Sequence, residues 1–134
     1  MEIMPIDISL SVENKDGSLI ANLLFFNKTP RTYYLDRFSI SYDGKFYRNM
    51  FHIVDELGRV MPYTGMMVKR LVKGEHFLPL ETGAMMKTTV IINNGYLLKK
   101  GLRYTVRYMV NNPGYLRGQE MMKLQSNEVK VEYE

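Results

Sequence analysis

Apolar and polar residues alternate with a period of two along most of this chain, and apolar residues at helical spacing are almost absent. In the stretch PIDISLSVE (residues 5–13), every second residue is apolar. Successive side chains of a strand point to opposite faces, so this pattern predicts a strand with one buried face. The next stretch, SLIANLLFF (residues 18–26), is apolar on both faces, which predicts a strand that is either covered on both sides or central. The same alternation recurs in residues 84–93, 102–110 and 127–133.

Turn signals separate the alternating stretches. Gly17 can adopt positive φ, and Asp43-Gly44 is a strong hairpin signal. Residues 37–47 (RFSISYDGKFY) are therefore predicted to form a strand that enters a hairpin at Asp43-Gly44. Turn signals recur about every 8–12 residues without a strand–helix–strand rhythm. We therefore expect an all-β fold, an antiparallel β-sandwich of about seven to nine strands, as a single domain over residues 1–134.

Composition excludes several classes of function. The sequence has no cysteine, so it can form neither disulfides nor thiolate metal sites. No apolar run reaches the roughly 18–20 residues of a membrane span, so we expect none. The net charge of +4 comes from scattered basic residues without a nucleic-acid-binding motif, and we expect no nucleic-acid partner. Residues 1–10 lack the pattern of a secretory leader. The compartment stays open: it is periplasmic or secreted if a leader has been removed, and cytoplasmic otherwise.

The stretch from Met50 to Arg70 raises the question of a catalytic or metal site, because His52 lies three residues before Asp55-Glu56. A zinc peptidase site needs two histidines one helical turn apart, and neither a helix nor a second histidine is found near His52. Asp55-Glu56 occupies a position where turns favour polar residues. We interpret the stretch as a hairpin and expect no catalytic residue, metal or cofactor, which makes the chain a non-enzyme.

Two stretches carry a resemblance to known families. KKGLRYTVRY (residues 99–108) and SNEVKVEY (residues 126–133) resemble the last two strands of bacterial immunoglobulin-like domains. Within the first, Tyr104 resembles the tyrosine-corner position, which implies that its hydroxyl bonds back to the preceding loop.

A wider match joins FSISYDGKFY, VMPYTGMMVKR, FLPLETG and GYLLKKGLRYTVRY. Together these stretches are similar to the N-terminal β-sandwich domain of aspzincin (deuterolysin-like) metallopeptidases, and the resemblance covers about residues 6–133. The sequence lacks the His-Glu-x-x-His motif of the catalytic half of those enzymes. The resemblance implies an immunoglobulin-like, non-catalytic sandwich that binds another protein, such as a peptidase, as an inhibitor or a pro-domain-like partner.

Two long connections, Thr64–His76 and Asn111–Met122, are the candidate binding loops, because loops on a rigid sandwich are available for contacts. They can equally be irregular crossovers whose apolar residues pack underneath. Two other functions stay open: a structural subunit that self-associates through an edge strand, and an enzyme of an unrecognised kind. The candidate binding residues are Met66, Met67, Arg70, Tyr115, Leu116 and Arg117.

Overall fold

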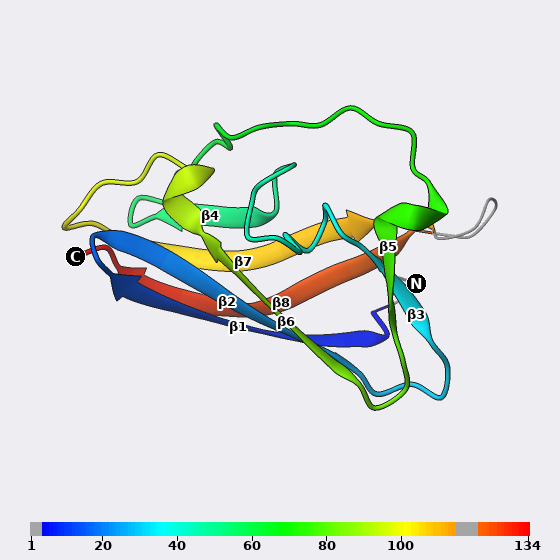
Figure 1. Cartoon of the computed structure of the whole chain (residues 1–134). Helices are drawn as coiled ribbons and strands as arrows, with labels where there is room; N and C mark the ends of the chain where they lie inside the picture. Colours follow the sequence, from blue (N-terminus) through cyan, green and yellow to red (C-terminus); the bar gives the residue numbers. More distant parts are fainter. Residues whose placement is uncertain (1–3, 115–120) are drawn as a thin grey trace.

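A computed structural model describes residues 4–114 and 121–134, which form eight strands and two short 3₁₀ turns (Figure 1). The strands are β1 (Ile6–Lys15), β2 (Ser18–Asn27), β3 (Tyr33–Asp36), β4 (Phe51–Asp55), β5 (Phe77–Leu80), β6 (Met85–Ile91), β7 (Arg103–Asn112) and β8 (Met122–Glu132). The 3₁₀ turns are η1 (Gly74–His76) and η2 (Ile92–Asn94). The predicted all-β class and the strand number of about seven to nine are confirmed.

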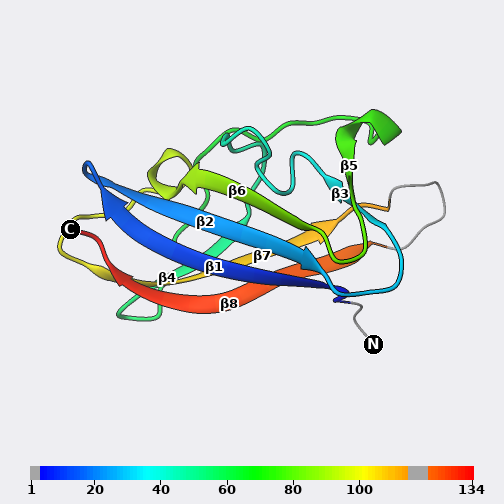
Figure 2. The ribbon, with the colours of Figure 1, turned by 60° about the horizontal axis from the view of Figure 1, so that its bottom comes forward.

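Six strands form one curled sheet in the order β4-β7-β8-β1-β2-β6, and β3 pairs with β5 in a small second sheet. All strand pairings are antiparallel except that of β1 with β8, which is parallel and has a single register pair, Ile8 with Ser126. Figure 2 shows the β1-β2-β6 half of the sheet beside the β4-β7-β8 half. The rings of Phe25 on β2 and Tyr108 on β7 meet edge to face at 5.7 Å. The two halves therefore pack as a sandwich.

In β2 the observed burial of the side chains matches the alternation in the sequence. Its inward residues Leu19, Ala21, Leu23 and Phe25 are completely buried, as the pattern requires. β2 lies between β1 and β6, so of the two predicted alternatives the central position is confirmed. The apolar residues on its outer face are only partly buried.

Residues 37–47 do not form the predicted strand and hairpin. The chain makes a series of turns there, in which Ser39 N–H donates to Asp36 O and Tyr42 N–H to Arg37 O. Side-chain bonds complete these turns: Ser39 Oγ donates to the Asp36 carboxylate at 2.6 Å, and Ser41 Oγ to Lys45 O at 2.8 Å. Local bonds of this kind compete with a sheet ladder for the backbone. Gly44 still has positive φ, but in a turn of a loop.

The last two strands agree with the sequence in a finer detail. Tyr104 is buried, and the backbone N–H of Lys99 donates to its hydroxyl at 2.9 Å. The expected bond between this hydroxyl and the preceding loop is confirmed.

Candidate functional site

His52 and Asp55, which raised the question of acid–base or metal chemistry, lie in a hairpin. Asp55 Oδ1 accepts the backbone N–H groups of Leu57 and Arg59, both at 2.9 Å, and Asp55 Oδ2 accepts Arg59 Nε at 2.7 Å. These bonds, above all that from the Arg59 backbone, hold the pKa of Asp55 below its usual value. His52 lies on the solvent-exposed face of β4. The hairpin interpretation is confirmed for residues 51–61, where Asp55 N–H donates to Arg59 O and Met61 N–H donates to Ile53 O. The rest of the stretch, residues 64–70, is irregular.

Within residues 4–114 and 121–134, no three His, Cys, Asp or Glu side chains gather in a way that could hold a metal ion. The same part of the chain contains no helix long and apolar enough to cross a membrane.

The segment Thr64–His76 crosses the top of the molecule in Figure 1 without regular secondary structure up to η1. Its backbone is nevertheless attached to the body of the protein. Thr64 N–H donates to Gly95 O at 2.8 Å, and Val68 N–H donates to Tyr47 O at 3.0 Å. These bonds fix the path of the segment at two positions.

Arg70 is the third attachment of this segment. Its Nη2 lies 2.5 Å from Asp36 Oδ2, its Nη1 lies 2.9 Å from His76 Nδ1, and its guanidinium stacks over the Phe38 ring at 4.5 Å. The side chain of Asp36 is 1% exposed and that of Arg70 is 17% exposed. Arg70, predicted as a binding residue, is therefore committed to an internal ion pair. Sequence reasoning missed its partner, which lies 34 positions away and follows no motif.

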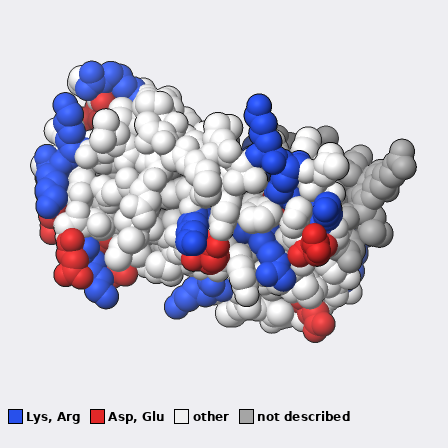
Figure 3. All heavy atoms as spheres, turned by 45° about the horizontal axis from the view of Figure 1, so that its top comes forward, with Lys and Arg blue, Asp and Glu red and all other residues white. Residues whose placement is uncertain are grey.

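Between these attachments, large apolar side chains point into solvent. Met67 and Leu71 are 73% and 82% exposed. We call the exposed apolar residues of the segment the apolar ridge; they are Met66, Met67, Val68, Leu71 and Val72. Figure 3 shows the top face of the molecule, where a broad area without charged side chains lies beside groups of lysine, arginine and acidic residues. Two of the predicted binding residues, Met66 and Met67, are thus accessible on a fixed segment.

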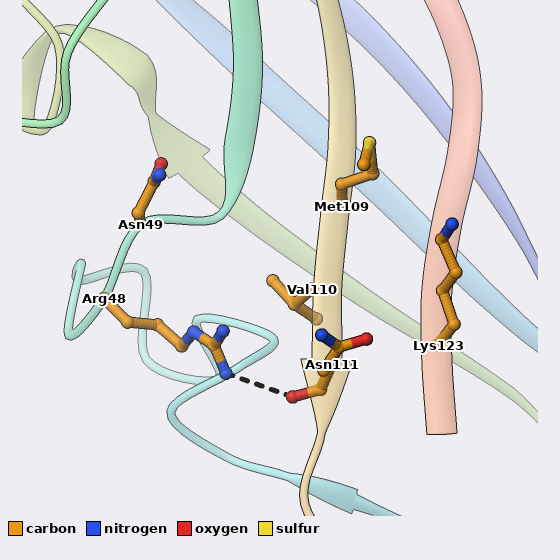
Figure 4. A pocket seen from close by; sticks show the side chains of 6 residues that line it. All are labelled: Arg48, Asn49, Met109, Val110, Asn111 and Lys123. Carbon is orange, nitrogen blue, oxygen red and sulfur yellow. Dashed lines mark hydrogen bonds between the residues drawn. The ribbon is translucent and has the colours of Figure 1, made fainter. Parts of the chain in front are cut away.

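The other predicted binding residues, Tyr115, Leu116 and Arg117, lie outside the described residues. The strands that flank them are described, and beside the end of β7 lies a surface pocket of about 330 Å³ (Figure 4). Its lining combines two cations, two amides and two apolar side chains: Arg48, Lys123, Asn49, Asn111, Met109 and Val110. Arg48 and Asn49 belong to the irregular region before β4, and no sequence motif marks them.

In comparisons with known proteins, neither a family model nor a curated protein matches this chain.

Proposed function

We propose that this chain is a non-catalytic protein-binding module and that the apolar ridge is its partner surface. The observation that carries the proposal is the combination of exposed large apolar side chains with an anchored backbone. Contiguous exposed apolar surface on a soluble domain is typical of interaction sites. A segment held at Thr64, Val68 and Arg70 presents that surface with little loss of conformational entropy on binding.

The strand pairing supports the immunoglobulin-like part of this proposal. The first strand runs parallel to the last, and the bond between Lys99 and Tyr104 has the form of a tyrosine corner. We propose a peptidase as the partner class, with the chain acting as an inhibitor or a pro-domain-like partner. That part rests on the resemblance of the sequence to the N-terminal domain of aspzincin peptidases.

The test compares two variants that each place acidic residues on exposed apolar positions. Met67→Glu combined with Leu71→Glu changes the apolar ridge, and Leu97→Glu changes a residue that is 78% exposed in a different segment. Partners captured with the wild-type protein are purified, and their affinity for each variant is measured. Truncating an interface anchor typically costs about 2 kcal/mol or more, so we expect the double variant to bind at least about tenfold more weakly.

The Leu97→Glu control should keep the wild-type affinity, and both proteins should keep the wild-type melting temperature. Equal affinity of the folded double variant would exclude the apolar ridge as the partner surface. Captured partners are also assayed for peptidase activity with and without the chain. Absence of peptidase activity among them would exclude the peptidase assignment while leaving the binding surface intact.

A further inference from the structure

The pocket beside the end of β7 contains the guanidinium of Arg48, which two hydrogen bonds hold in place. Arg48 Nη1 donates to Ser39 Oγ at 3.1 Å and to the backbone carbonyl of Asn111 at 3.2 Å. Figure 4 shows the Arg48 side chain reaching from the segment before β4 toward β7, with its bond to Asn111 at one end of the guanidinium. In the described part of the chain, no acidic side chain forms an ion pair with Arg48.

The other lining residues include a lysine, two amides and two apolar residues. Lys123 projects from β8 at the same pocket, and none of the described lining residues is acidic. Asn49 Oδ1 accepts the hydroxyl of Tyr96, which is buried, so the amide nitrogen of Asn49 is the group left for a ligand. Of the two apolar lining residues on β7, Met109 is exposed and Val110 is buried, so Met109 is the apolar side chain that a ligand can contact.

The fixed position of Arg48 matters for what the pocket can bind. Its two bonds go to neutral acceptors, which orient the planar guanidinium without neutralising it. A carboxylate matches the fork of an arginine with two parallel N–H···O bonds, and such charge-assisted bonds are about twice as strong as neutral ones. A volume of about 330 Å³ is at the small end of ligand pockets and suits a group of side-chain size.

We propose that this pocket binds a carboxylate on a short aliphatic stem, namely an acidic side chain of a partner protein. The carboxylate pairs with Arg48 beside Lys123, and the aliphatic stem lies against Met109. This inference does not depend on the apolar ridge, because it concerns different residues and is tested with a small probe.

The probe is N-acetyl-glutamate N-methylamide, whose only carboxylate is that of the side chain. It is titrated at constant ionic strength into the isotope-labelled protein, and backbone amide shifts are followed by NMR. We expect saturable shifts centred on Asn49, Val110 and Asn111. The matched N-acetyl-glutamine N-methylamide, which has the same shape without the charge, should bind at least tenfold more weakly.

Two variants test the role of the guanidinium. Arg48→Gln should weaken binding of the glutamate probe at least tenfold, whereas Arg103→Gln, which removes an exposed arginine elsewhere, should leave it unchanged. Asn111→Asp serves if Arg48→Gln fails to fold. Arg48 contacts the backbone of Asn111 and not its side chain, so this variant keeps that bond while placing a competing carboxylate in the pocket.

The proposal would be overturned by equal binding of the glutamine probe, by unchanged binding in a folded Arg48→Gln or Asn111→Asp variant, or by shifts centred elsewhere. Inorganic phosphate is the further arm. If phosphate displaces the glutamate probe at equal or lower concentration, the pocket is a general anion site and the assignment to an acidic side chain is wrong.

Discussion

The side-chain amide of Asn127 hydrogen bonds to both backbone groups of Leu10, accepting its N–H at 2.8 Å and donating to its carbonyl at 3.1 Å. The amide thus takes the place of a backbone pair between β8 and β1. It lies where the β7–β8 register shifts by a bulge, and Tyr108 N–H there bonds to Ser126 Oγ. The Asn127 side chain therefore joins the two halves of the sheet at this position, while Asn14 joins them near the end of β8.

Asn127→Ala should lower the free energy of unfolding by about 2 kcal/mol, because two partly buried backbone groups of Leu10 lose their partner. Urea denaturation measures the change. Asn22→Ala is the control: its amide bonds to the exposed side chains of Glu13 and Thr89, and we expect a cost within about 0.5 kcal/mol. Equal effects of the two substitutions would show that Asn127 has no special role at the junction.

Tyr104→Phe should destabilise the protein by about 1 kcal/mol, since the Lys99 N–H loses its acceptor while the ring remains in the core. Tyr42→Phe removes the hydroxyl of an exposed tyrosine and should leave the urea midpoint unchanged. If both variants have the wild-type midpoint, the corner bond does not contribute to stability.

Thr88→Val should stabilise the protein by up to about 1 kcal/mol. The Thr88 hydroxyl is buried on the inner face of β6 and has no hydrogen-bond partner among residues 4–114 and 121–134, so a methyl group removes a desolvation cost without losing a bond. Thr89→Val on the exposed face of the same strand is the matched control. It removes a bond to Asn22 and should bring no gain in thermal stability. A lower melting temperature for Thr88→Val would indicate a partner for this hydroxyl.

The sequence predicts those elements in which burial alone decides the structure. The alternation in residues 18–26 requires one dry face, and β2 has that face in the predicted phase. Residues 37–47 alternate as well, yet there the Asp36 carboxylate accepts the backbone N–H of Phe38 and the Ser41 hydroxyl donates to Lys45 O, so side chains satisfy backbone groups locally. Periodicity carries no information on such bonds.

The same distinction between local sequence pattern and tertiary contact applies to the candidate site. The sequence leaves open whether the apolar residues of the long connection are exposed or pack underneath, and the structure shows that Met66 and Met67 are exposed. Pairing of Arg70 with Asp36 depends on a tertiary contact between segments that are 34 positions apart, which a local pattern cannot reveal. The Arg48 pocket likewise combines residues from three separate segments.

Stability should fall as the pH rises above about 10, because two buried tyrosines must stay protonated in the folded state. Burial raises the pKa of Tyr96 to about 12. Burial also raises the pKa of Tyr108, whose hydroxyl donates to Ser39 O at 2.6 Å. In the unfolded chain both titrate near pH 10, so the unfolded state releases protons first.

Each of these tyrosines should lower the free energy of unfolding by about 1.4 kcal/mol per pH unit above pH 10, and the Tyr96 contribution should level off near pH 12. Urea midpoints at a series of pH values between neutral and alkaline measure this slope. Tyr96→Phe should make the slope shallower by the share of one tyrosine. A wild-type midpoint independent of pH in this window would contradict burial of the two hydroxyls.

Arg70→Met should destabilise the protein by about 3 kcal/mol and release the segment that carries the apolar ridge. The substitution leaves the Asp36 carboxylate, which is 1% exposed, without its counter-charge, and breaking one side of a buried ion pair typically costs about 3–5 kcal/mol. Arg59→Met breaks an ion pair whose arginine is largely exposed, so its cost should stay below about 1 kcal/mol.

Urea denaturation measures both costs, and limited trypsin digestion reports cleavage at Lys69, which both variants keep. We expect faster cleavage at Lys69 in Arg70→Met only, and partial recovery of stability when Asp36→Asn is added, since the buried charge is then gone. Wild-type stability and wild-type cleavage in Arg70→Met would show that the segment is held without this ion pair.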